Sequence, residues 1–179
     1  MPRRILYVVL ALAATVSVTA AGVALAAGSQ GGGQLVAAKG KEFWEANGFV
    51  AATFRWDPGT ILVSSGNLVT FAHGNTGGEP HTVTLARKAQ LPTSFDSPCK
   101  PCDVASGHLK NPRNENSGVA HWVLNKGAVG FDRVGDSLAL APKGPHSRAT
   151  IVVSAPVGTT LYYVCAIHPW MQGKIVVSQ

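Results

Sequence analysis

Three side chains near the C-terminus have the types and the spacing of metal ligands. Cys165, His168 and Met171 follow one another at intervals of three residues, in a short loop between two apolar segments. A thiolate, an imidazole and a thioether suit a copper ion that cycles between Cu(I) and Cu(II), because soft sulfur favours Cu(I) and imidazole binds both states. A blue-copper site needs a second His, which must come from elsewhere in the chain.

His81 is the candidate for this second imidazole. It stands at the start of an apolar segment, after a turn rich in Gly and Asn. The start of a strand near one end of a β-sandwich can face the loop between the last two strands. We therefore predict a copper site with these ligands: His81, Cys165, His168 and Met171. Two alternatives remain open, because Cys165 could be a buried thiol beside a surface His, and Gln172 could be the axial ligand while Met171 packs in the core.

The segments that must position these ligands have the pattern of short β-strands. Apolar or alternating runs, separated by turn residues, occur at 50–54, 61–63, 68–72, 82–85, 122–124, 137–140, 149–153, 160–165 and 174–177. Residues 41–48 could form either a short helix or an irregular first strand. The pattern predicts an all-β fold, an antiparallel sandwich or barrel with alternating side chains in its core.

Residues 49–83 and 149–177 resemble the cupredoxin family, in particular plastocyanins and amicyanins. The matching residues are Phe54, Pro58, Ile61, Val63, Gly66, Val69, Phe71, Asn75, Pro80 and His81, and then Gly158, Tyr162, Tyr163, Cys165, His168, Met171, Gly173 and Lys174. The resemblance implies a Greek-key β-sandwich with one type 1 copper ion. It also implies that His81, Cys165 and His168 are equatorial ligands and that Met171 is axial, with the short ligand loop of amicyanins.

The chain departs from the family in two places. Thr82 stands where the family commonly has Asn directly after the first ligand His, and its hydroxyl could still form a hydrogen bond. A polar stretch at about 87–120 lengthens the chain between the two halves of the site, so we interpret it as an insertion. A loop of this length is usually functional or mobile.

Cys99 and Cys102, in this insertion, have three interpretations. They could form a local disulfide, which suits an oxidising compartment. They could belong to a second metal site with His108 or His121, or they could be a thioredoxin-like redox pair, although no βαβ pattern surrounds them. The remaining histidines share no spacing and are expected to be ordinary surface or turn residues: His73, His108, His121 and His146.

The N-terminal segment predicts export from the cytoplasm. Residues 5–27 carry no charge, follow Arg3 and Arg4, and end near an Ala-Leu-Ala sequence. Residues 1–27 are therefore either a cleaved signal peptide or a retained membrane anchor. Residues 28–38 are predicted to be a flexible Gly-rich linker, and residues 39–179 the copper domain.

These observations favour a single-copper electron carrier outside the cytoplasm, in the periplasm or at the outer face of the membrane. The formal net charge of +6 is spread along the chain without a Lys/Arg run, so no nucleic-acid partner is expected. No paired His-x-His motif indicates a multicopper oxidase, and no enzyme activity is expected. The alternatives are a copper storage or delivery protein, and a protein with a second metal site within residues 99–121.

The ligand loop itself predicts where electrons leave the protein. His168 is expected to lie nearer to solvent than His81 or Cys165, because it stands in a loop rather than beside apolar strand residues. Pro169 and Trp170 follow it and could form an apolar patch on which redox proteins dock, although Trp170 could instead pack against the loop.

Overall fold

The computed structural model describes residues 33–94, 96–102 and 123–179, and these contain twelve β-strands and two short 3₁₀ helices, η1 (Lys88–Gln90) and η2 (Pro145–Ser147). The predicted all-β class is confirmed for this part of the chain. None of its helices is long and apolar enough to cross a membrane. Residues 5–27, His108 and His121 lie outside the described residues.

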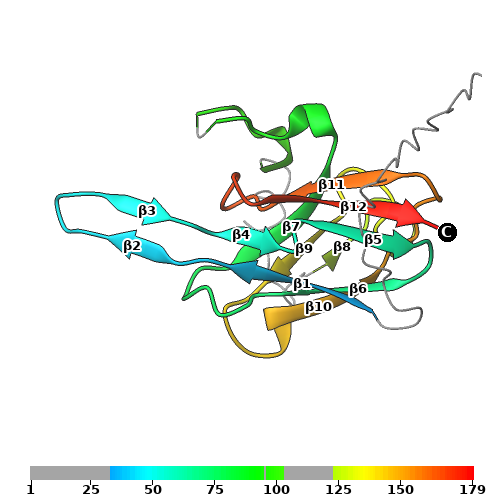
Figure 1. Ribbon diagram of the computed structural model, residues 1–179, viewed down its shortest axis with the longest axis horizontal. Coiled ribbons are helices and arrows are strands. Elements are labelled where there is room, and N and C mark those ends of the chain that lie inside the picture. The colour runs from blue at the N-terminus through cyan, green and yellow to red at the C-terminus, as the bar shows by residue number, and fades with distance from the viewer. Residues whose placement is uncertain (1–32, 95, 103–122) are drawn as a thin grey trace, which may run out of the picture.

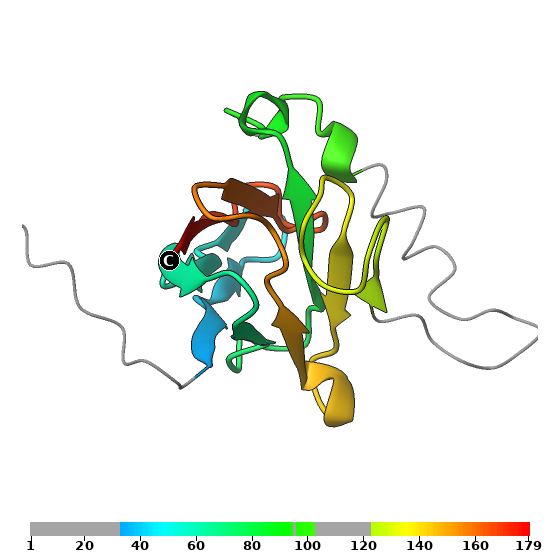
Figure 2. The same ribbon diagram turned by 90° about the vertical axis from the view of Figure 1, so that its right-hand side faces the viewer.

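Two sheets form a sandwich (Figures 1 and 2). The first has the order β10-β6-β1-β4, with β1 (Gln34–Lys39), β4 (Arg55–Asp57), β6 (Leu68–Ala72) and β10 (Arg148–Val152). The second has the order β5-β12-β11-β7-β9-β8, with β5 (Thr60–Ser64), β7 (His81–Ala86), β8 (Val123–Leu124), β9 (Ser137–Leu140), β11 (Thr160–Val164) and β12 (Gln172–Ser178). Most pairs are antiparallel as expected, but β1 with β6 and β5 with β12 are parallel.

The core lies between the two sheets and is built by alternation along their strands. Val69 and Phe71 of the first sheet and Leu85, Tyr163 and Ile175 of the second are all buried in one apolar cluster. Because side chains of a strand alternate between its two faces, every second residue of these strands reaches this cluster. The rings of Phe71 and Tyr163 meet edge to face with centroids 5.4 Å apart, which joins the two sheets.

The predicted linker at 28–38 is wrong for its last residues. Residues 34–38 belong to β1, which pairs with both β4 and β6. Val36 and Ala38 are fully buried, so this strand contributes to the core rather than to a spacer. The apolar run at 35–38 is only four residues long, does not alternate and follows directly on a Gly-rich segment, so the sequence pattern does not distinguish this strand from the linker.

The helix considered for residues 41–48 does not form. A hairpin takes its place, in which β2 (Glu42–Trp44) pairs with β3 (Val50–Ala52). The hairpin continues β1 and β4 and projects beyond the body of the sandwich (Figure 1). It projects from the end that carries the β11–β12 loop, whereas β1 begins toward the end that carries the C-terminus.

Candidate metal centre

Three of the predicted ligands converge at one end of the second sheet. The imidazoles of His81 and His168 approach with their Nδ1 atoms 3.2 Å apart, and Cys165 Sγ lies 4.0 Å from His81 Nδ1 and 3.7 Å from His168 Nδ1. One ligand atom from each residue falls within 4.8 Å of the others. Among the described residues no other group of three His, Cys, Asp or Glu side chains meets in this way.

Strand pairing explains why residues so far apart in the sequence meet. β7 and β11 are antiparallel neighbours, with Val164 opposite Thr84, so the start of β7 and the end of β11 lie at the same end of the sheet. His81 opens β7, and Cys165 directly follows β11. The register of this strand pair therefore brings His81 close to Cys165.

Backbone hydrogen bonds fold the ligand loop over this end. The N–H of Cys165 donates to the carbonyl of Met171 at 2.9 Å, and the N–H of Met171 donates to the carbonyl of His168 at 2.8 Å. Gly173 follows at a position where any side chain would collide with the ring of Tyr163. The loop is thus closed by its own main chain and tightened by a glycine that permits close approach.

Met171 and Gln172, the two candidates for an axial ligand, differ in their surroundings. Met171 is fully buried in the same apolar cluster as Cys165. Gln172 donates through its amide to the carbonyls of Pro92 and Pro169 at 2.8 and 2.9 Å. The NH2 group of Gln172 is therefore held by the insertion and the loop, and the burial of Met171 with the thiol favours Met171 as the axial ligand.

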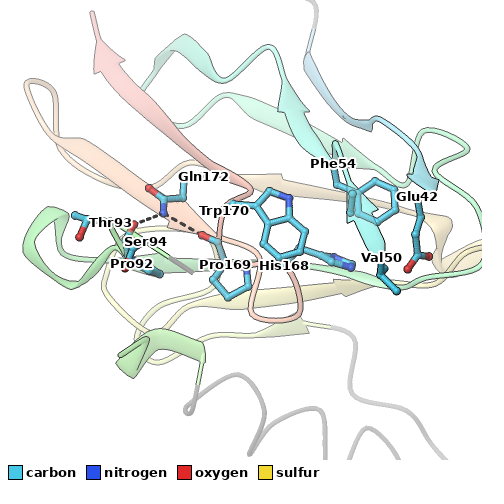
Figure 3. A pocket seen from close by; sticks show the side chains of 11 residues that line it. Glu42, Val50, Phe54, Pro92, Thr93, Ser94, His168, Pro169, Trp170 and Gln172 are labelled. Atoms are coloured by element: carbon cyan, nitrogen blue, oxygen red, sulfur yellow. Dashed lines mark hydrogen bonds between the residues drawn. The ribbon is translucent and has the colours of Figure 1, made fainter. Parts of the chain in front are cut away.

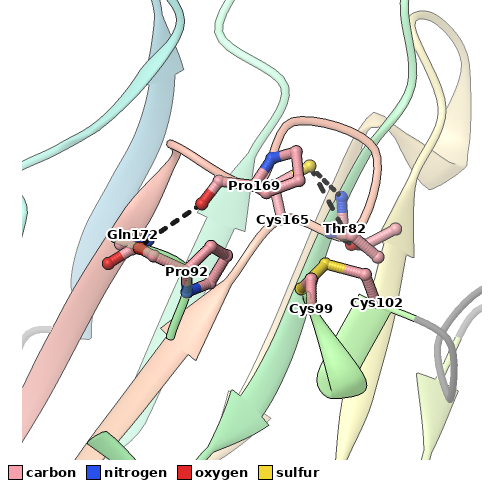
Figure 4. Close-up of a disulfide and its surroundings, with 8 residues drawn as sticks. Thr82, Pro92, Cys99, Cys102, Cys165, Pro169 and Gln172 are labelled. Atoms are coloured by element: carbon pink, nitrogen blue, oxygen red, sulfur yellow. Dashed lines mark hydrogen bonds between the residues drawn. A yellow bond between two sulfur atoms is a disulfide. The ribbon is translucent and has the colours of Figure 1, made fainter. Parts of the chain in front are cut away.

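Thr82 holds the Cys165 side of the site in two ways (Figure 4). Its main-chain N–H donates to Cys165 Sγ at 3.3 Å. Its hydroxyl lies 3.9 Å from the same sulfur and accepts a hydrogen bond from the N–H of Ala166 at 2.7 Å. The hydrogen bond expected from the Thr82 hydroxyl is thus present, and it ties the first ligand strand to the Cys loop.

Burial sets the protonation of the ligand side chains. It lowers the pKa of His81 to about 3, helped by the neighbouring imidazoles of His168 and His73, and it lowers the pKa of His168. Burial raises the pKa of the Cys165 thiol, although hydrogen bonds from Thr82 oppose this effect. Both imidazoles are therefore neutral and able to donate a lone pair at pH 7, while the thiol must lose its proton to bind a metal.

His73 is a residue that the sequence interpretation missed. It is expected at the surface or in a turn, yet only 2% of it is exposed, and its ring lies 5.0 Å from that of His81. A signal was present, because His73 continues the alternation of Val69 and Phe71, which are both buried. His146, by contrast, is exposed in η2 as expected.

Cys99 and Cys102 form a disulfide (Figure 4). The local-disulfide interpretation is confirmed, and in this state neither sulfur is available as a thiolate ligand. Cys165 is the free cysteine, and it is buried.

A cleft of about 750 Å³ opens beside His168 (Figure 3). The hairpin and Phe54 line one side, Pro92, Thr93 and Ser94 the other, and His168, Pro169 and Trp170 lie between them. His168 is 7% exposed whereas His81 and Cys165 are fully buried, so the expected order of solvent access is confirmed. Trp170 is 43% exposed, and its ring meets that of His168 edge to face at 5.3 Å.

The donor set fits a copper ion. Two neutral imidazoles and a thiol converge, and a buried thioether lies in the same cluster. This combination of soft sulfur and imidazole is the one that copper proteins of the blue class use, whereas Mg²⁺ and Ca²⁺ prefer oxygen ligands that this cluster lacks.

The sequence matches no protein-family model and no curated protein. Solved structures that are similar include a purple cupredoxin from Nitrosopumilus maritimus (16% identity over 81% of this chain and 99% of that chain, TM-score 0.37). They also include plastocyanin from Dryopteris crassirhizoma (22%, 80% and 98%, TM-score 0.37) and auracyanin from Roseiflexus castenholzii (18%, 81% and 95%, TM-score 0.38). The sequence resemblance implied a β-sandwich and a His–Cys–His set of ligands, and the described residues contain both. At these identities and TM-scores the function must be inferred from the site itself.

Proposed function

We propose that this protein carries single electrons through one copper ion bound by His81, Cys165, His168 and Met171. The observation that supports this most is the convergence of a buried thiol with two neutral imidazoles at the end of a rigid sandwich. When bound, a copper ion in such a site supplies one-electron redox chemistry between Cu(I) and Cu(II).

The protein's own residues provide a fixed and dry environment for that ion. His81 and Cys165 are attached to paired strands, and Thr82 ties them together. Ligands that keep one arrangement in both oxidation states reduce the rearrangement that electron transfer requires. Of the proposed ligands the cleft reaches only His168, while His81, Cys165 and Met171 are fully buried, which favours a carrier over an enzyme and over a delivery protein that exchanges its ion.

The cleft beside His168 is the proposed docking surface for a redox protein. Its walls are mainly apolar, and Trp170 presents an exposed ring directly over the most accessible ligand. The adjoining hairpin adds exposed apolar side chains: Phe43, Trp44, Phe49 and Val50. Small redox encounters bury little area, and aromatic side chains make effective contacts in them.

The proposed location is outside the cytoplasm. The disulfide of Cys99 and Cys102 suits an oxidising compartment. β1 begins at the end of the sandwich opposite the ligand loop (Figure 1). If residues 5–27 are retained as an anchor, the domain is therefore tethered to the membrane from that end. The cleft, at the other end, would then remain accessible to partners.

The visible spectrum of the copper-loaded protein tests the proposed site. We expect one copper ion per chain and an intense thiolate-to-copper band that Cys165→Ala abolishes while the sandwich stays folded. Gln172→Ala serves as the control and should retain the band. A band that persists in Cys165→Ala would refute the ligand assignment, and two metal ions per chain would support the second-site alternative.

Electron exchange with a partner tests the docking surface. Trp170→Lys should slow the exchange and leave the copper spectrum nearly unchanged. Val157→Lys is a matched control, because Val157 is 53% exposed and precedes β11, at the end away from the ligand loop. If Trp170→Lys loses copper while the rate per intact site is unaltered, Trp170 packs the loop and docking occurs elsewhere.

A further inference from the structure

The loop between β6 and β7 places a hydroxyl group behind His81. Gly74 and Asn75 both have positive φ values, +67° and +63°, which these two residue types tolerate better than most. A side chain at position 74 would also collide with the main-chain oxygen of Ala38. This reversal of the chain brings Thr76 back over His73 and under the imidazole of His81.

Hydrogen bonding at Thr76 favours one position for the His81 proton. Thr76 Oγ1 lies 2.6 Å from His81 Nε2, 3.3 Å from the carbonyl oxygen of His73 and 3.5 Å from His73 Nε2. His73 Nε2 donates to the carbonyl of Glu79 at 2.7 Å, so the carbonyl of His73 is the acceptor that it offers to Thr76. A carbonyl can only accept, so the hydroxyl proton can point to His73 while the oxygen accepts from a protonated Nε2. If the hydroxyl instead donated to Nε2, the His73 carbonyl would lose this partner and the His81 proton would sit on Nδ1.

Packing around His81 fixes the plane of its ring but not the position of its proton. The ring of His73 lies against it at 5.0 Å with an angle of 34°, and the rings of Phe54 and Trp56 meet it edge-on at 5.4 and 6.0 Å. These contacts prevent the imidazole from turning over. They carry no preference between a proton on Nδ1 and one on Nε2. The hydrogen-bonding groups that meet the two nitrogens are His168, whose Nδ1 lies 3.2 Å from His81 Nδ1, and Thr76, whose hydroxyl oxygen lies closer to Nε2, at 2.6 Å.

We propose that Thr76 is a positioning residue that holds His81 with its proton on Nε2, so that Nδ1 faces Cys165 and His168 ready to bind metal. The proposal rests on the ligand role proposed above for His81. Its distinctive element is the side-chain hydroxyl of Thr76, which a tight turn brings to His81 and which also contacts the carbonyl of the buried His73. Partners of this kind orient a ligating imidazole and raise its basicity.

The proton position can be read directly in copper-free protein labelled with 15N-histidine. The nitrogen shifts and proton couplings of His81 should report a protonated Nε2 in the unaltered protein. Thr76→Val, which keeps the shape and removes the hydroxyl, should populate the form with the proton on Nδ1, and Thr76→Ser should restore the original state. Thr84→Val is the matched control, because Thr84 is equally buried on β7 but its hydroxyl has no hydrogen-bond partner.

Copper affinity gives an independent measurement. Loss of a hydrogen-bond partner behind a ligand typically weakens metal binding about tenfold to a hundredfold, so we expect this for Thr76→Val but not for Thr76→Ser or Thr84→Val. A proton on Nδ1 in the unaltered protein, measurable even if Thr76→Val does not fold, would overturn the proposal. An unchanged proton position and affinity in Thr76→Val would also overturn it. Failure of the proposed function would appear separately, as the absence of a thiolate-to-copper band in the unaltered protein.

Discussion

The hydrogen bond between Ala166 and the Thr82 hydroxyl offers a sharp test of how the two halves of the site are joined. Thr82→Val is nearly isosteric and keeps the main-chain N–H that donates to Cys165. It removes the acceptor of the Ala166 N–H, which lies 2.7 Å away in a part-buried position. The substitution therefore removes the short hydrogen bond from Ala166 together with the longer 3.9 Å contact between the hydroxyl and Cys165 Sγ, and it leaves the main-chain hydrogen bond to that sulfur in place.

The expected cost follows from the buried donor that is left without a partner. An unsatisfied buried N–H costs about 1–3 kcal/mol, and partial access of water to Ala166 puts the expected value at about 1–2 kcal/mol. For a domain of this size that corresponds to a fall in Tm of roughly 2–8 °C. The thiolate-to-copper band should remain, since Cys165 keeps its ligand position and the Thr82 N–H.

Urea unfolding of the copper-free protein measures this loss. Thr82→Ser should recover most of the free energy of unfolding, because its hydroxyl can accept the same hydrogen bond. Thr84→Val should stay within about 0.5 kcal/mol of the unaltered protein, since it removes a hydroxyl that has no partner. If Thr82→Val were as stable as the unaltered protein, or if Thr84→Val lost as much, the bond to Ala166 would not stabilise the site.

Three further predictions concern the thiols, the axial ligand and pH. The isolated copper-free protein should have one free thiol, Cys165, that reacts with a thiol reagent only after denaturation; three free thiols would contradict the disulfide. Met171→Leu should change the visible spectrum and potential of the copper-loaded protein far more than Gln172→Leu, and the reverse ranking would make Gln172 the axial ligand. Stability of the copper-free protein should fall as the pH drops from 6.5 toward 3, because unfolded His81 binds a proton in this window and folded His81, with its pKa of about 3, does not. The slope from His81 is up to about 1.4 kcal/mol per pH unit, and urea titrations should show it flatten in His81→Gln.

The sequence predicted the site best in the loop between the last two strands, where the ligand types and the flanking strand pattern occur in one short segment. The spacing of Cys165, His168 and Met171 lies within one loop, so the nature of the site could be predicted without knowing any long-range contact. His81 was harder, because its place depends on the pairing of β7 with β11, and the residues between them give no local sign of it. Its position at a strand start was still visible, and the structure brings it to the predicted cluster.

The residues that the sequence concealed act through long-range contacts. β4 was not predicted because Trp56 stands alone between two charged residues, although it is 3% exposed and packs near His81. β1 lies beside a Gly run, and its partners are distant in the sequence. Thr76 is part of no sequence pattern. Its hydroxyl is one of several in a polar turn, and its role at His81 becomes visible only once the turn folds back under that ring.

The two imidazoles of the site are held in different ways, and this difference bears on how the site would work. His81 is enclosed by Phe54, Trp56 and His73, and its far nitrogen meets Thr76. His168 stands in a loop at the floor of the cleft, against the exposed ring of Trp170. A carrier needs one side of its metal fixed, so that the geometry does not depend on the partner, and the other side close to the surface, so that the electron path is short. Changes around Thr76 should therefore alter the affinity and potential of the metal, while changes around Trp170 should alter the rate of electron exchange. If Thr76 variants changed mainly the exchange rate, or Trp170 variants mainly the metal affinity, this division would be contradicted.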